Sequence, residues 1–139
     1  MKTQRLVLTL LAVTFALAPQ SPRTASAEGQ RGRYAAKLMS PNAGAVLLPG
    51  QVVRVEWMVI FPSVDLTKCE TEVFLSVDGG KTFTFVTNVH NPHVQYFDWI
   101  VPRSPTKAAI LDIRFGCLGL FPETSSPQVQ STFEISSMD

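Results

Sequence analysis

Apolar and polar side chains alternate along much of this chain, most clearly from Gln51 to Val59. Valines and Trp57 occupy the odd positions of this run, and Arg54 and Glu56 lie between them. A period of two residues is typical of a strand that buries one face of its sheet. We therefore predict a half-buried β-strand over this range, with Trp57 in the core.

A second informative stretch, LSVDGGKTFTFV, runs from Leu75 to Val86. β-branched and aromatic residues flank Asp78, Gly79 and Gly80, which tolerate the backbone angles of a tight turn. The pattern predicts a β-hairpin in which these three residues form the turn. We interpret Asp78 as a turn-forming residue and not as a catalytic one, because Asp side chains readily accept hydrogen bonds from turn amides.

Similar short runs recur through the rest of the chain, separated by Pro, Gly, Ser and Asn, and none has convincing helical periodicity. Seven or eight strands with turn residues every 8–12 positions are typical of a sandwich. The sequence predicts an all-β chain, an immunoglobulin/fibronectin-III-like antiparallel β-sandwich. The other predicted strands are Tyr34–Met39, Ala45–Leu48, Cys69–Val77, Thr82–Thr87, Val94–Val101, Lys107–Cys117 and Gln130–Ser136.

The first 27 residues have the organisation of a secretory signal peptide. Lys2 and Arg5 precede an uncharged apolar run, and Ala25-Ser26-Ala27 fits a small-x-small cleavage site. We predict a signal peptide over 1–27, a loose lead-in over 28–33 and one sandwich domain over 34–139. The product would be secreted, periplasmic or at the cell surface, with no stable membrane insertion after cleavage.

Charge limits the partners of such a product. Cleavage would remove three of the 12 basic residues and leave all 11 acidic ones, which gives a net charge of −2. A nearly neutral surface argues against nucleic acid or anionic membrane as partner, since both require a basic patch.

The chain has two cysteines, Cys69 and Cys117. An even pair in an exported protein favours a disulfide over a metal pair or a catalytic thiol. Cys69 would begin the third long strand and Cys117 would end the sixth, and these strands are antiparallel neighbours in the predicted sandwich. The two thiols should therefore meet.

Three stretches together resemble the immunoglobulin-like domain of the fungal cell-wall β-1,6-glucan synthesis protein family, which also occurs in secreted bacterial chains. They are PGQVVRVEW from Pro49, LSVDGGKTF from Leu75 and WIVP from Trp99. The resemblance covers most of the predicted domain and implies a secreted, non-catalytic binding module without active-site residues. The residues around Asp78 also look like a single Asp-box, a turn repeated in sialidase propellers.

Residues that could support catalysis are few. His90 and His93, with Asp98 nearby in the sequence, are weak candidates for a Zn²⁺ or Cu²⁺ site, because Pro92 separates them and no third ligand has a diagnostic spacing. No nucleophile elbow or phosphate-binding loop is present. We predict no metal, no cofactor and no enzymatic activity.

Three loops, Ile60–Lys68, Asn88–His93 and Leu118–Gln128, are expected at one end of the sandwich. Two of them are apolar, and their side chains either plug the core or contact a partner. We predict an exported binding or adhesion module at the cell envelope, whose partner is a protein or a cell-surface glycan. The alternatives are a secreted carbohydrate-recognition module and a metal-dependent enzyme. The predicted contact residues are Ile60, Phe61, Leu118, Leu120 and Phe121.

Overall fold

The computed structural model describes residues 32–138. The predicted signal peptide, residues 28–31 of the predicted lead-in and Asp139 lie outside the described residues. Within 32–138, no helix has the length and apolar character needed to cross a membrane.

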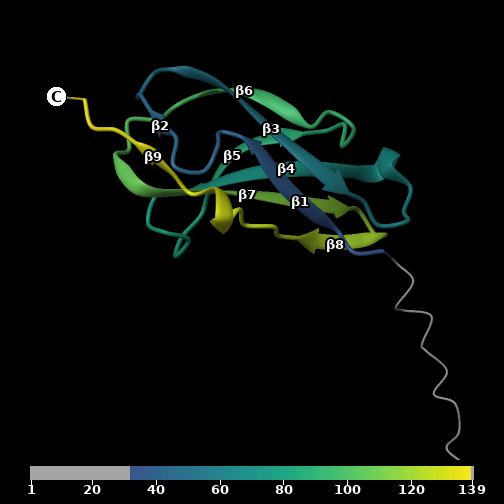
Figure 1. Cartoon of the computed structure of the whole chain (residues 1–139). Coiled ribbons are helices and arrows are strands. Elements are labelled where there is room, and N and C mark those ends of the chain that lie inside the picture. The colour runs from purple at the N-terminus through teal and green to yellow at the C-terminus, as the bar shows by residue number, and fades with distance from the viewer. Residues whose placement is uncertain (1–31, 139) are drawn as a thin grey trace, which may run out of the picture.

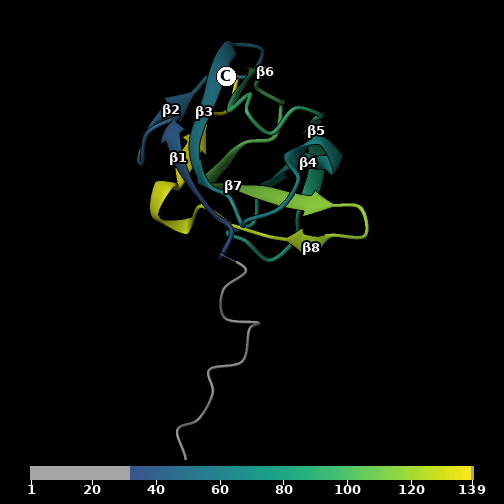
Figure 2. The same cartoon turned by 90° about the vertical axis from the view of Figure 1, so that its right-hand side faces the viewer.

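Nine strands over the described range form two sheets (Figures 1 and 2). The smaller sheet has the order β1-β3-β6, and the larger has the order β2-β9-β7-β4-β5, with β8 also paired to β7. Two short 3₁₀ helices, η2 (Leu66–Lys68) and η3 (Val129–Ser131), interrupt the connections. The strands are β1 (Ala35–Ser40), β2 (Val46–Leu47), β3 (Val52–Ile60), β4 (Cys69–Ser76), β5 (Thr84–Val89), β6 (Tyr96–Ile100), β7 (Thr106–Cys117), β8 (Phe121–Thr124) and β9 (Phe133–Ile135).

The predicted all-β sandwich is confirmed, with three corrections. There are nine strands and not seven or eight, and β2 runs parallel to β9 although every other pair is antiparallel. The segment predicted as a loop over Leu118–Gln128 contains β8, because a turn with Gly119 at φ +71° brings Phe121 opposite Cys117. Pro122 is tolerated there because β8 pairs with β7 alone.

The core lies between the two sheets and follows the predicted alternation. Val55 and Trp57 of β3 are buried, and so are the inward side chains of the other long strands. Val77 is an exception: β4 ends at Ser76, and Val77 is 40 % exposed where the chain enters the turn. The main core contains Leu38, Leu47, Val55, Trp57, Val73, Leu75, Trp99, Val101, Ala109, Leu111, Ile113, Phe133 and Ile135.

Strands β4 and β7 form the longest ladder in the described range. Eight residue pairs run from Cys69 opposite Cys117 to Ser76 opposite Ile110. The first of these pairs is a disulfide, as the sequence predicted. The bridged residues are 48 positions apart, and closing a loop of this length stabilises the fold by about 4 kcal/mol in the chain-entropy model.

A buried glutamine side chain joins the two sheets. Gln128 is 1 % exposed, and its backbone N–H donates to the carbonyl of Leu111 in β7. Its side-chain Oε1 accepts from the Leu38 N–H of β1 at 2.7 Å, and its Nε2 donates to the Ala36 carbonyl at 3.1 Å. The amide thus pairs with β1 as another strand would. It satisfies the Leu38 N–H and the Ala36 carbonyl on the edge of the smaller sheet that no strand covers.

We expect Gln128→Leu to lower the free energy of unfolding by about 1–3 kcal/mol, because it leaves the buried Leu38 N–H without an acceptor. Urea denaturation measures this loss. Gln95→Leu is the matched control: Gln95 lies in the β5–β6 connection, its side chain takes no part in the contact with β1, and its substitution should cost less than about 0.5 kcal/mol. Equal stability of the Gln128 variant and the wild type would contradict this role.

Candidate functional site

The three predicted loops lie at one end of the sandwich, opposite the C-terminus (Figure 1). The ring of Phe61, from the β3–β4 connection, lies 6.1 Å from that of His93 in the β5–β6 connection. A groove at the same end is lined by Thr67, His90 and Leu118. These residues come from the β3–β4, β5–β6 and β7–β8 connections, respectively. The sandwich therefore brings these distant segments together.

Phe115 of β7 organises the apolar residues beneath these loops. It is fully buried, and three aromatic rings surround it: Tyr34 at 5.1 Å, Phe61 at 5.3 Å and Phe121 at 5.8 Å between centroids. The Tyr34 hydroxyl donates to the Ile113 carbonyl, and burial, with a smaller contribution from Asp112, raises the pKa of Tyr34. Phe61 and Phe121 are half-buried and close this end of the core.

The other three predicted contact residues point into solvent. Ile60 is 69 % exposed, Leu118 is 91 % exposed and Leu120 is 43 % exposed. Leu118 occupies the tip of the β7–β8 turn, which is closed by a hydrogen bond from the Leu120 N–H to the Cys117 carbonyl. The five predicted residues therefore divide into two that cover the core and three that remain accessible.

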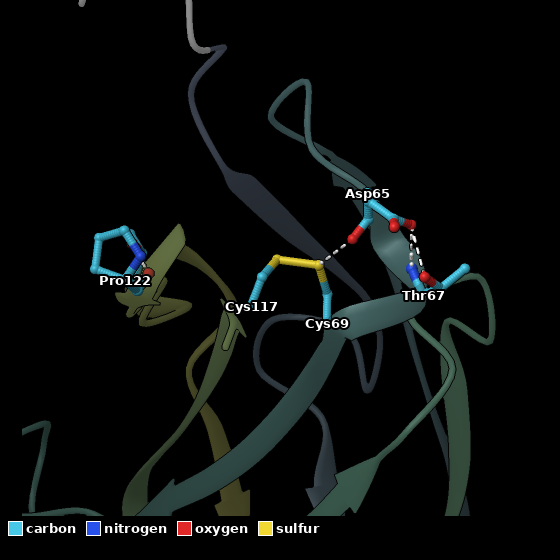
Figure 3. Close-up of a disulfide and its surroundings, with 6 residues drawn as sticks. Asp65, Thr67, Cys69, Cys117 and Pro122 are labelled. Atoms are coloured by element: carbon cyan, nitrogen blue, oxygen red, sulfur yellow. Dashed lines mark hydrogen bonds between the residues drawn. A yellow bond between two sulfur atoms is a disulfide. The ribbon is translucent and has the colours of Figure 1, made fainter. Parts of the chain in front are cut away.

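The disulfide joins Cys69, the first residue of β4, to Cys117, the residue before Leu118 (Figure 3). Both cysteines are buried, at 4 % and 5 % exposure. The Cys69 sulfur lies 3.1 Å from the Asp65 carbonyl oxygen, and since a bridged sulfur carries no hydrogen, this is an S···O contact. Asp65 also accepts from the backbone and hydroxyl of Thr67, which caps η2 and lowers the pKa of Asp65. The bridge thus fixes the bases of two loops.

A groove of about 750 Å³ opens on the outer face of the larger sheet beside the disulfide. β4 contributes Glu70 and Glu72 to one wall, and β8 contributes Glu123 to the other. Between them, Gly116 of β7 forms the floor. A Cβ at this position would lie 3.2 Å from the Glu123 Cα, so glycine permits the close approach of β8.

Charged side chains line this groove unevenly. Arg114 donates to the buried Asp112 at 2.7 Å and to Glu123 at 3.2 Å, and its guanidinium stacks 3.8 Å above the Phe74 ring. Glu70 accepts from the Asn88 amide at 2.7 Å. Glu72 is half-buried, and its carboxylate makes no hydrogen bond or ion pair with any residue of the described range. Burial, then repulsion from Glu123 and Glu70, raises the pKa of Glu72, and Arg114 opposes this shift.

The two histidines face different neighbours. The Nδ1 atom of His90 lies 3.6 Å from Glu70, whereas His93 packs edge-on against Phe61. Asp98, considered with them in the sequence, is instead paired with Arg54 on the smaller sheet. Within residues 32–138, no three His, Cys, Asp or Glu side chains group as a metal site would require.

Asp78 forms the predicted turn at the opposite end of the β4–β7 ladder. Its carboxylate accepts from the backbone N–H groups of Lys81 and Thr82 and from the hydroxyls of Thr82 and Ser76. Gly79 and Gly80 adopt φ angles of +75° and +91°, which glycine tolerates without strain. Asp78 is thus fully engaged in holding the turn.

Sequence reasoning missed the charged groove. Glu70, Glu72 and Arg114 occupy the polar positions of two strands that were predicted only for their inward faces. The alternation of these strands already indicated that the three side chains point outward. Glu123, however, lay in a segment predicted as a loop. Without β8, nothing placed its carboxylate opposite those of β4.

A comparison with protein-family models finds no family that matches this chain, and a comparison with curated proteins finds no match either. Any statement of function therefore has to come from the site itself.

Substitution of an apolar residue that covers the core should affect stability more than substitution of one that is exposed. Phe121→Ala should lower the free energy of unfolding by roughly 1–3 kcal/mol, less than for a fully buried phenylalanine, because the ring packs against Phe115. Leu118→Ala should change it by less than about 0.5 kcal/mol, because Leu118 is almost fully solvated. Chemical denaturation of both variants tests the assignment, which an equal loss in the two variants would contradict.

Acid should weaken the Asp78 turn. Hydrogen bonds from Thr82 first, then from Ser76 and Lys81, lower the pKa of Asp78 below its usual value. The stability from this shift is therefore present above the unfolded-state pKa of about 3.9 and is lost as the pH falls toward the folded-state pKa. We expect Asp78→Asn to lower the melting temperature at pH 7 and to make it less dependent on pH below about 5. Parallel acid-melting curves for the two proteins would refute this expectation.

Proposed function

We propose that this protein is an exported, non-catalytic binding module of the immunoglobulin-like type that acts at the cell envelope. Its contact surface would be the exposed apolar end formed by Ile60, Leu118 and Leu120, together with the adjacent groove. Phe61 and Phe121 would support this surface from below. The partner would be a protein.

The observation that carries this proposal is the 91 % exposure of Leu118 at a turn whose base is closed by a disulfide. An apolar side chain held in water by a rigid frame gains from being covered, and clustered loops on a sandwich are common binding sites. A disulfide is favoured in oxidising compartments, which supports export. The strand orders β1-β3-β6 and β9-β7-β4-β5 support the immunoglobulin-like assignment.

A carbohydrate-recognition module is the weaker alternative. Flat aromatic side chains commonly provide a stacking surface, yet Trp57 and Trp99 are 2 % and 6 % exposed. Both are committed to the core, so no tryptophan of the described range is available to a sugar ring.

The test compares two matched double variants in capture experiments on a cell-envelope fraction. Leu118→Ser with Leu120→Ser should abolish retention of the partner, and the melting temperature should remain within about 2 °C of the wild type. Val52→Ser with Ile100→Ser is the control, since both residues are exposed and paired on the outer face of the smaller sheet. Retention that survives in the first variant, or is lost equally in both, would overturn the proposed contact surface.

A further inference from the structure

The groove beside the disulfide has a more specific character than the apolar end that it adjoins. Resting on the function proposed above, we infer that the groove binds an extended peptide segment in which a lysine or arginine side chain lies next to a leucine-like one. The partner protein would present this segment, and three features of the groove define it.

The first feature is shape. β7 runs along the floor between β4 on one side and β8 on the other, so the groove follows the strand direction. On the floor, Gly116 is paired with Glu70 of β4 and lets the backbone of β8 at Glu123 approach closely, so no side chain of β7 rises between the two walls at this position. A volume of about 750 Å³ lies within the range of ligand sites, and residues of three neighbouring strands line it.

The second feature is charge. Glu70, Glu72 and Glu123 face the groove, and the cations that line it are Lys68 and Arg114. Arg114 already pairs with Asp112, which is 2 % exposed, and with Glu123 at 3.2 Å, so its charge is shared between two carboxylates of the fold. The groove therefore has an excess of negative charge that a cation of the partner would balance.

Glu72 concentrates this excess. Its half-buried carboxylate has neither a hydrogen bond nor an ion pair within residues 32–138. A partly desolvated carboxylate without a hydrogen bond is costly; its neighbours Glu70 and Glu123 raise this cost, and the attraction of Arg114 does not offset it. A lysine ammonium or an arginine guanidinium would remove the cost and gain a charge-assisted hydrogen bond.

The third feature is the apolar rim. Leu118 lines the groove and Leu120 follows it in the same turn, so a cation in the groove would bring its neighbouring side chain against these leucines. The carboxylates of the groove would select the cationic side chain of the peptide, and the leucines at its rim would select the apolar one. A neutral sugar would satisfy neither the charge of Glu72 nor the leucines.

Isothermal titration calorimetry with synthetic peptides tests the inference on the purified protein. The probe is an acetylated hexapeptide of alternating lysine and leucine, and the comparison peptide replaces each lysine by glutamate. We expect the lysine peptide to bind and the glutamate peptide not to bind. Glu72→Gln should weaken binding about tenfold at low salt, and salt should reduce the wild-type affinity.

Glu56→Gln is the matched control, because Glu56 is an exposed carboxylate on the smaller sheet, away from the groove. It should leave the affinity unchanged, and both variants should keep the wild-type melting temperature. Equal binding of the two peptides, no effect of Glu72→Gln, or preferential binding of a neutral oligosaccharide would overturn the inference.

Failure here can be distinguished from failure of the proposed function. If the lysine peptide does not bind but Leu118→Ser with Leu120→Ser still abolishes partner capture, the charge inference is wrong and the contact surface stands. If that double variant captures its partner normally, the proposed contact surface is wrong, whatever the peptides do.

Discussion

The pairing of β4 with β7 determines the rest of this structure, because it sets which side chains lie inside and which lie outside. Cys69 opposite Cys117 begins a continuous register of eight pairs. Because successive side chains alternate between faces, this register places Val73 and Ile113 in the core and Glu72 and Arg114 on the outer face. A slip of one residue would bury the charges and expose the core. The disulfide fixes the register at one end, and the Asp78 turn closes the other.

The same strands explain how far the sequence predicts the fold. Alternation predicted β3, β4 and β7 because each has several apolar residues at one parity, and the disulfide followed from two cysteines at the ends of neighbouring strands. The Gln128 contact was beyond prediction, since its side chain meets β1 from 90 residues away. Local pattern contains no information about a contact of this range. β8 was missed for a different reason: glycine and proline were interpreted as loop residues, although here they form a turn and an edge strand.

Phe115 explains why apolar composition alone left the role of the loop residues open. Phe61 and Phe121 are apolar, as are Leu118 and Leu120, but only the two phenylalanine rings pack against Phe115. Because β7 directs Phe115 inward beneath the loops, the two phenylalanine rings find an apolar surface within reach. The Leu118 side chain, by contrast, is 91 % exposed and packs against no such surface. The sequence left a core plug and a contact surface as alternatives. In the structure, Phe61 and Phe121 cover the core, whereas Ile60, Leu118 and Leu120 remain exposed.

The edge strands of the two sheets determine how readily the fold could pair with the backbone of another chain. Gln128 satisfies the outer edge of β1, so the smaller sheet offers few free backbone groups on that side. The larger sheet ends at β5, whose six residues carry no charge, but a register irregularity opposite Val73 and Phe74 disturbs its pairing. Irregularities of this kind make an edge a poor template for another strand. Backbone pairing with another chain is thereby disfavoured at β1 and at β5. Side-chain recognition at the disulfide-closed end is more consistent with this architecture, because there exposed leucines adjoin a groove whose three glutamates outnumber its lysine and arginine.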